Sequence, residues 1–389
     1  MSNDLTPSTK PQRLLSLDAF RGMTIIGMVL VNNPGTWEAG QRYGLLDHAP
    51  WHGWTPTDLI FPFFLFIVGV SMTISLGARA AAGASRRQLA LSMARRAAVI
   101  FAVGLLLNFI PRLDLATLRI PGVLQRIALC SLLATPIVLA CRWRGVLAWL
   151  LGLCALYALP MLALPVPDAQ GVVATGVLEP GRDFGAWLDR QLLAGHLWSV
   201  SRTWDPEGLW STLPAVGSVL AGVLTGRYLA LQQPHLRQAA ALLLAGLVLL
   251  GLGLLLDRVF MPINKNLWTP SYMVFMAGWS LLAFAAFYAA LDAAPQPALR
   301  RAAAWLCRPL VIYGMNALFI FALSGLVARL MGFFQVGNPA RSVKAALYEW
   351  IQMLPLAPQD ASLLWALLFN LAMFDIAWWM WSRRWFIKA

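Results

Sequence analysis

Long apolar stretches alternate with short polar segments along the whole chain. A helix needs roughly 20 apolar residues to cross a bilayer core about 30 Å thick. Ten stretches come close to that length, at residues 21–35, 57–77, 97–111, 121–141, 145–164, 211–230, 238–256, 271–291, 309–331 and 361–381. Several contain Gly, Pro or a polar residue, which membrane helices tolerate when neighbouring helices satisfy the freed backbone groups. The pattern predicts an all-α, polytopic integral membrane protein with about ten transmembrane helices.

The polar segments between these stretches are too short to be domains of their own. Residues 1–16 are polar and have no cleavable signal pattern, so they are expected to form a cytoplasmic tail. The longest interruption, at residues 165–209, is expected to be a long outer loop. No internal repeat is visible. We therefore expect one transmembrane domain over residues 1–389.

Composition supports a membrane protein and narrows its partners. Of the 389 residues, 59% are hydrophobic and 12% are charged, against roughly 45–50% and about 25% in soluble proteins. A net charge of +13 would suggest nucleic acid for a soluble domain, but this composition argues against it, and no nucleic-acid partner is expected. The four cysteines lie in or beside apolar runs without CxxC spacing, so neither a disulfide framework nor a zinc site is expected.

The basic residues predict the orientation. If the N-terminus lies inside, the inner loops collect the arginine-rich segments at 79–96, 142–144, 227–237, 300–308 and 383–388, whereas the outer loops hold most of the acidic residues. Positive charge favours the cytoplasmic side of a membrane protein. An even number of helices then places both termini in the cytoplasm.

A histidine and an aspartate next to the second apolar stretch form the best candidate for acid–base chemistry. His48 and His52 lie within five residues of each other, and Asp58 follows where that helix begins. An imidazole oriented by a carboxylate can accept a proton near neutral pH. The alternative for Asp58 is a helix cap, and the alternative for His52 is an exposed loop residue. The spacing does not fit a metal site, so no metal is expected.

Other polar residues fall at the outer ends of the predicted helices. Arg126 lies about two turns into an apolar helix, and its alternative role is to reach out to lipid headgroups or bind carbonyl groups. Glu207 precedes the sixth helix. The segment before the eighth helix has three amide or ammonium donors, Asn264, Lys265 and Asn266, close to the indole of Trp268. This combination resembles a sugar-binding surface, although a polar loop with an interfacial Trp is the alternative. With Asn32, His48 and Asp58, these residues predict a polar pocket that opens outward.

Two polar residues belong to the inner side. Arg21 follows Asp18 in the first helix. It could bind an anionic ligand, since a guanidinium binds phosphate through two parallel hydrogen bonds. The alternative is an interfacial ion pair. Asn316 lies in the inner half of the ninth predicted helix, where Asn often only joins helices.

Eight motifs occur in an order that is typical of one family. They are LDAFRG at 17–22, VN at 31–32, HAPW at 48–51, DLIFP at 58–62, PGVLQR at 121–126, DPEG at 205–208, PINKNLW at 262–268 and GMNAL at 314–318. The chain resembles the heparan-α-glucosaminide N-acetyltransferase family, and most closely its bacterial NagX-type branch.

The resemblance implies acetyl transfer across a membrane. Family members take acetyl from cytoplasmic acetyl-CoA and deliver it to the amine of glucosamine on the far side. The family's catalytic histidine corresponds to His48 and its companion asparagine to Asn32, although the segment between them is longer here. The expected partners are acetyl-CoA, an amino-sugar acceptor and the lipid bilayer, with a homodimer left open. The expected location is the bacterial inner membrane.

Acetyl transfer from a thioester to an amine needs a base and donors that stabilise an oxyanion. We assign His48 as base or transient acetyl acceptor, Asp58 as the group that orients it, and Asn32 as an oxyanion donor. The sugar or the pantetheine end would meet Arg126, Glu207 and the 264–268 residues, and the CoA nucleotide would meet Arg21 and Asn316. The alternatives are an amino-sugar transporter, which could use the same pocket, and an O-acyltransferase acting on cell-surface polysaccharide.

Overall fold

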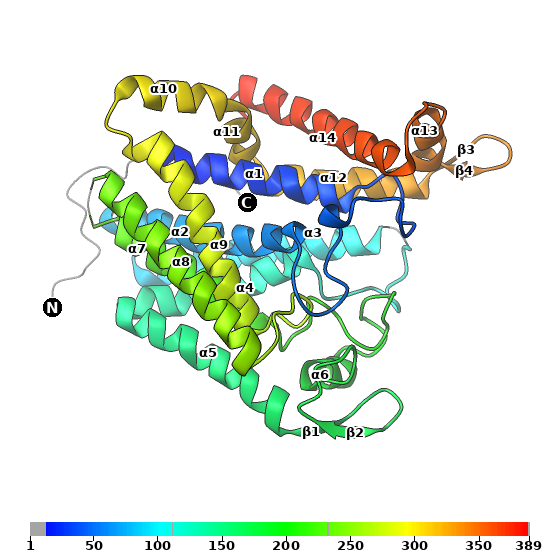
Figure 1. The fold of residues 1–389 in the computed structure, drawn as a ribbon, viewed down its shortest axis with the longest axis horizontal. Helices are drawn as coiled ribbons and strands as arrows, with labels where there is room; N and C mark the ends of the chain where they lie inside the picture. The colour runs from blue at the N-terminus through cyan, green and yellow to red at the C-terminus, as the bar shows by residue number, and fades with distance from the viewer. Residues whose placement is uncertain (1–12, 111, 232, 388–389) are drawn as a thin grey trace.

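The fold is a set of long helices that run roughly side by side (Figure 1). It is a computed structural model that describes residues 13–110, 112–231 and 233–387, so most of the expected tail at 1–16 lies outside the described residues. In chain order the elements are α1 (Leu15–Asn32), η1 (Gly44–Leu46), η2 (Pro56–Leu59), α2 (Ile60–Ala81), α3 (Arg86–Phe109), α4 (Val123–Ala140), α5 (Trp143–Ala163), β1 (Pro165–Pro167), β2 (Val173–Thr175), α6 (Phe184–Leu192), α7 (Thr212–Leu229), α8 (Leu236–Val259), α9 (Pro270–Tyr288), η3 (Ala289–Ala293), α10 (Pro297–Leu306), α11 (Arg308–Met315), α12 (Ala317–Phe333), β3 (Gln335–Val336), β4 (Arg341–Ser342), α13 (Val343–Gln352) and α14 (Pro358–Ser382).

Within the described residues, each of the ten apolar stretches lies mostly in helix. Eight helices of the described chain are long and apolar enough to cross a membrane, and a ninth results if α11 and α12, which are bent by 78°, count as one span. The all-α membrane class is therefore confirmed. The number of spans and the side on which the termini lie stay predictions.

The remaining expected span, α7, is more polar because it lies inside the bundle rather than against lipid. Most of its residues are buried, and it packs against α2 at very short range. A Cβ on Gly222 would lie 2.0 Å from the Phe66 carbonyl oxygen, and one on Gly69 would lie 1.9 Å from that of Val219. Small residues let membrane helices approach this closely.

The expected single span at 309–331 is instead a broken helix. The break lies at Asn316, where α11 ends and α12 begins. The Asn316 amide donates to the Trp385 carbonyl oxygen at 2.9 Å, and its Oδ1 atom accepts from the Ile387 N–H at 2.9 Å. The C-terminal segment is thereby tied to the bend. Hydropathy could not show this break, because both halves are apolar.

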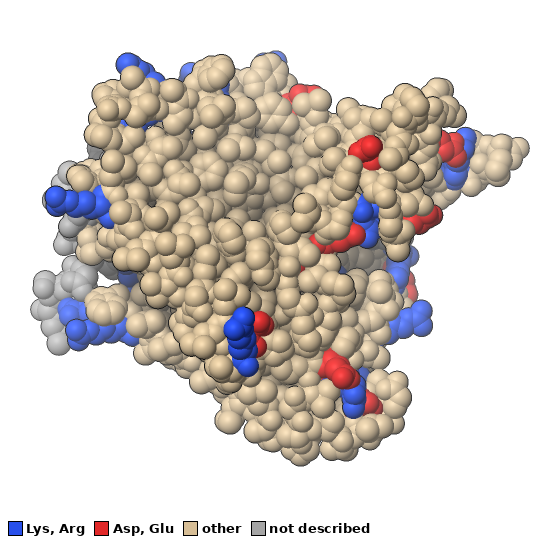
Figure 2. Space-filling model, viewed as in Figure 1, with Lys and Arg blue, Asp and Glu red and all other residues tan. Residues whose placement is uncertain are grey.

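Charged side chains gather at the two ends of the bundle. Figure 2 shows a broad face that is mostly uncharged, apart from one cluster of both signs low in the middle, between a left end, where Lys and Arg predominate, and a right end, where both signs occur. We call the right and lower part, which carries the connections at 33–59, 112–122, 164–211 and 260–269, the site end, and the left end the basic end. The expected long loop at 165–209 lies at the site end and contains the β1–β2 hairpin and α6.

Candidate active site

His48 and Asp58 are in direct contact at the site end. The Nδ1 atom of His48 lies 2.6 Å from the Oδ1 atom of Asp58. The carboxylate is completely buried, whereas 46% of the imidazole is exposed. Because Nδ1–H donates to the carboxylate, the Nε2 atom presents its lone pair to the surroundings. This arrangement suits a general base whose tautomer is set by a carboxylate.

The local sequence fixes the carboxylate before it meets the imidazole. Thr55 and Asp58 form a capping box at the start of η2, where Pro56 fits the first helical position. The Oδ2 atom of Asp58 accepts from the backbone N–H of Thr55 at 2.9 Å and of Ala49 at 3.1 Å. Asp58 is therefore both the helix cap and the partner of His48, so the two alternatives left open for it hold together.

The loop between α8 and α9 brings a lysine to the exposed side of the imidazole. The Nζ atom of Lys265 lies 3.0 Å from Nε2 of His48. The two loops are joined by the Gly53 N–H, which donates to the Ile263 carbonyl oxygen at 2.8 Å, and by the Asn264 amide, which donates to Nδ1 of His52 at 3.2 Å. Burial lowers the pKa of Lys265, while the negative charges of Glu207 and Asp58 oppose this effect.

An arginine clamp holds the segment before α7. Arg119 donates to both carboxylate oxygens of Asp205, at 2.8 and 2.6 Å, and to Oε2 of Glu207 at 2.6 Å. Burial raises the pKa of Glu207, but the positive charges of Arg119, Arg126 and Lys265 outweigh this effect and hold it below its usual value. Glu207 is therefore an anion fixed close to the cation of Lys265.

Arg126 is buried and only partly satisfied. Its Nη2 atom donates to the Gly208 carbonyl oxygen at 2.9 Å and to the Ser211 hydroxyl, and its guanidinium lies 5.3 Å from the centre of the Trp268 ring. The Nε and Nη1 atoms are buried without a hydrogen-bond partner among the described residues. Buried donors without partners are costly, so these two can serve an oxygen atom of a ligand.

The expected sugar-binding surface at 264–268 is smaller than the sequence suggested. Lys265 and Asn266 are half-buried, but Asn264 and Trp268 are 0% and 1% exposed. Asn264 accepts from the Leu267 N–H at 2.9 Å, and the Trp268 indole donates to the Ser218 hydroxyl at 3.2 Å. The Trp268 ring is buried beneath Arg126, and the sugar-binding role assigned to it stays a prediction.

Three other predicted residues lie apart from His48. Asn32 ends α1 and is exposed, and among the described residues no contact joins it to His48. Arg21 lies toward the basic end, where it donates to Asp18 at 2.9 Å and to the Ser71 hydroxyl at 2.7 Å. Asn316, as described above, binds the C-terminal segment. The assigned roles of these three residues stay predictions.

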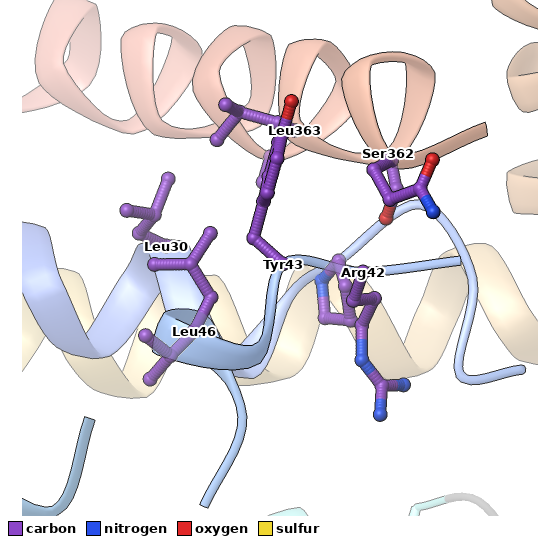
Figure 3. Close-up of a pocket in the computed structure, with 10 residues that line it drawn as sticks. Leu30, Arg42, Tyr43, Leu46, Ser362 and Leu363 are labelled. Carbon is purple, nitrogen blue, oxygen red and sulfur yellow. The ribbon is translucent and has the colours of Figure 1, made fainter. Parts of the chain in front are cut away.

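The loop that leads to His48 is anchored on α14. In Figure 3, the Tyr43 side chain extends beside Leu363 of α14, while the Arg42 guanidinium points away from that helix. The Tyr43 hydroxyl lies 2.5 Å from Oδ1 of Asp360, and Nε of Arg42 lies 2.7 Å from Oδ1 of Asp47. Asp47, the residue before His48, is thus held by Arg42 of the same loop.

Sequence reasoning missed two contributors to this site. Arg119 stands in a connection between helices, where an arginine attracts no notice, yet it joins Asp205 and Glu207 across more than 80 residues of sequence. The Tyr272 hydroxyl donates to the Asp58 carbonyl oxygen at 2.6 Å. Its position in the first turn of α9, just after the motif at 262–268, was the only available signal. Within the described residues, no group of three or more His, Cys, Asp or Glu side chains could hold a metal ion.

Comparisons with known proteins identify the family. Residues 13–251 match the family model described as the catalytic part of heparan-α-glucosaminide N-acetyltransferase. The human heparan-α-glucosaminide N-acetyltransferase is 29% identical over 379 residues, and the mouse protein of the same name is 26% identical over 377 residues. Each alignment covers 82% of this chain and 55% of the relative, so the chain spans about half the length of the curated relatives it matches.

Proposed function

The chain belongs to the heparan-α-glucosaminide N-acetyltransferase family, and we propose from this premise that it transfers acetyl from acetyl-CoA to the amine of a glucosamine-type sugar. The observation that carries the proposal is the contact of His48 with the buried carboxylate of Asp58, which engages Nδ1 and leaves Nε2, the nitrogen that Lys265 approaches, to act on an acceptor. Both residues lie inside the stretch that matches the family model.

His48 acts as the general base in this account. Its Nε2 atom takes a proton from the acceptor amine as the amine attacks the thioester carbonyl carbon, and the imidazolium then protonates the departing thiolate. Asp58 stabilises the imidazolium, because its buried carboxylate already accepts from Nδ1–H. Transient acetylation of His48 itself is a second route that the same contacts support.

Arg126 is the best supported oxyanion donor. Its Nε–H and Nη1–H groups are buried without partners among the described residues, and donors held in this way stabilise developing negative charge without reorganisation. Asn32, the donor first considered, lies at the exposed end of α1. We therefore assign Arg126 to the thioester oxygen and keep Asn32 as a candidate only.

The acceptor and the donor would approach from opposite ends. Lys265 lies beside His48 at the site end, and Glu207, whose charge acts on Lys265, can attract the ammonium form of an amino sugar. The CoA nucleotide would lie at the basic end, near Arg21 and Asn316. Arg21 already pairs with Asp18, so phosphate binding there must compete with that ion pair. In a bacterial inner membrane the site end would face the periplasm. A homodimer stays a prediction.

Purified protein incubated with acetyl-CoA and a panel of amino sugars tests the proposal. We expect release of CoA thiol that depends on the sugar, with an N-acetylated sugar as the product. Release of CoA thiol only when a polysaccharide with hydroxyl groups replaces the amino sugar would favour the O-acyltransferase alternative. Sugar uptake into liposomes without any CoA release would favour the transporter alternative.

A further inference from the structure

The amino group of Lys265 lies against the imidazole that we propose as the general base. Its Nζ atom lies 3.0 Å from Nε2 and 3.2 Å from Nδ1 of His48. A general base must lie within hydrogen-bond reach of the proton that it removes. The ε-amino group therefore lies within that reach of Nε2, the ring nitrogen that Asp58 does not bind.

The loop that carries Lys265 is fixed in this position. The Ile263 N–H donates to Oδ1 of Asp257 at 2.6 Å, and the Ile263 carbonyl oxygen accepts from Gly53 at 2.8 Å. Asn264 is fully buried and binds His52 on one side and the Leu267 N–H on the other. The side chain of Lys265 is thus presented to His48 by a backbone that is held from both directions.

The chemistry of this lysine suits nucleophilic attack. Burial lowers its pKa, against the opposing charges of Glu207 and Asp58, so a larger fraction is the neutral amine than in a free lysine. Neutral amines are the nucleophilic form of lysine. Lys344 offers a comparison: burial lowers its pKa too, but its Nζ atom donates to the Pro34 carbonyl oxygen at 2.8 Å and no imidazole contacts it among the described residues.

We propose that Lys265 is itself acetylated by the bound acetyl donor when no sugar amine occupies the site. This inference rests on the proposed acetyl transfer. The Nζ lone pair attacks the thioester carbonyl carbon, the new C–N bond forms, and the C–S bond breaks. The proton lost from Nζ passes to Nε2 of His48 and then to the CoA thiolate. The products are an Nε-acetyl-lysine and free CoA thiol.

This modification would turn the enzyme off. An amide carries no positive charge, so acetylation removes the cation that faces Glu207 and Asp58. The acetyl group would also fill the space beside Nε2. Amides are not cleaved by the same transfer step, and the loss of activity would persist after the sugar returns. The acceptor sugar protects Lys265 by occupying its place.

The test is peptide mass spectrometry of the full chain after incubation with acetyl-CoA, with and without glucosamine. We expect acetylation of Lys265 to rise with time, to be suppressed by glucosamine, and to fall by about 10²-fold or more in His48→Ala, since a general base contributes about that much. Lys344 serves as the matched lysine and should be modified slowly and equally in both proteins. Should His48→Ala fail to fold, Asp58→Asn gives the same comparison.

The outcomes separate the inference from the function on which it rests. If glucosamine is acetylated while Lys265 is modified no faster than Lys344, the inference is overturned and the proposed function stands. Equal modification of Lys265 in wild type and His48→Ala also overturns it, because the reaction is then not enzymatic. If neither glucosamine nor Lys265 is acetylated, the proposed function fails together with the inference.

Discussion

The buried carboxylate of Asp58 lies 2.6 Å from Nδ1 of His48 and also accepts from the backbone N–H of Thr55. A single side chain thus begins a helix and sets the tautomer of the only imidazole that contacts Lys265 among the described residues. The same carboxylate therefore serves both catalytic geometry and helix capping, and substitution by an amide can separate the two roles.

Asp58→Asn should retain the helix start but weaken catalysis. The new amide can still accept from Thr55 through its oxygen, whereas it cannot stabilise an imidazolium as a carboxylate does. We expect kcat to fall by about 10²–10⁴-fold, the range of a general base, with a small change in Tm. Steady-state kinetics and thermal unfolding of the purified protein check this. Near-normal kcat in a folded Asp58→Asn protein would remove Asp58 from the mechanism.

Arg119→Ala should weaken binding of the amino sugar and lower the stability of the fold. It removes the partner of two carboxylates, and breaking a buried ion pair by deleting one partner costs about 3–5 kcal/mol. We expect a lower Tm and a KM for the amino sugar that rises more than that for acetyl-CoA. Arg182, whose pairing with Glu179 is exposed, supplies the control Arg182→Ala. Equal effects of the two substitutions would argue against the clamp.

Stability should fall as pH rises toward 7, because of Asp189 in α6. Burial raises the pKa of its carboxyl group to about 7; the hydrogen bond from Leu209 opposes this shift, and the charges of Asp205 and Asp183 add to it. Between about pH 4 and 7 the folded protein keeps a proton that the unfolded chain loses, so its free energy of unfolding decreases with pH. Asp189→Asn should raise Tm at pH 8 but hardly at pH 4. A wild-type Tm that responds to pH just as the variant does would contradict this.

Gly222→Val should prevent close packing of α7 on α2. Its Cβ would lie 2.0 Å from the Phe66 carbonyl oxygen, a backbone atom that cannot move without the helix. Overpacking of this kind costs about 1–3 kcal/mol or more, and we expect a marked loss of folded protein in detergent. A Cβ on Gly152 of α5 would have no neighbour within 4 Å, so Gly152→Val should be tolerated. Similar yields and Tm values for both variants would show that the α2–α7 contact is not tight.

The sequence predicted the helices well because membrane spans must be long and apolar. It placed a helix at each of the ten stretches, but it missed α6, α10, α13 and the early start of α3 at Arg86. These segments are short, amphipathic or basic, so mean hydropathy does not mark them. The break at Asn316 was missed for another reason: it depends on the distant backbone of Trp385 and Ile387.

The candidate site was only partly predictable. His48 and Asp58 are ten residues apart, and their contact follows from one loop and one helix start. The contacts of Lys265 with His48 and of Arg119 with Glu207 span 217 and 88 residues. Only the packing of several helices brings residues so far apart in the sequence into contact. Trp268, in the connection before α9, is likewise covered by side chains of other elements, Arg126 of α4 and Phe61 of α2.

The central claim is that His48, and not its neighbour His52, is the base. The two imidazoles belong to one loop, but only His48 contacts a carboxylate, whereas His52 binds the Asn264 amide. The most direct measurement is therefore kcat for acetyl transfer to an amino sugar by His48→Ala and His52→Ala, with Tm as the control for folding. We predict a loss of about 10²-fold or more for His48→Ala and a change within a few-fold for His52→Ala. Near-normal turnover by a folded His48→Ala protein would contradict the account.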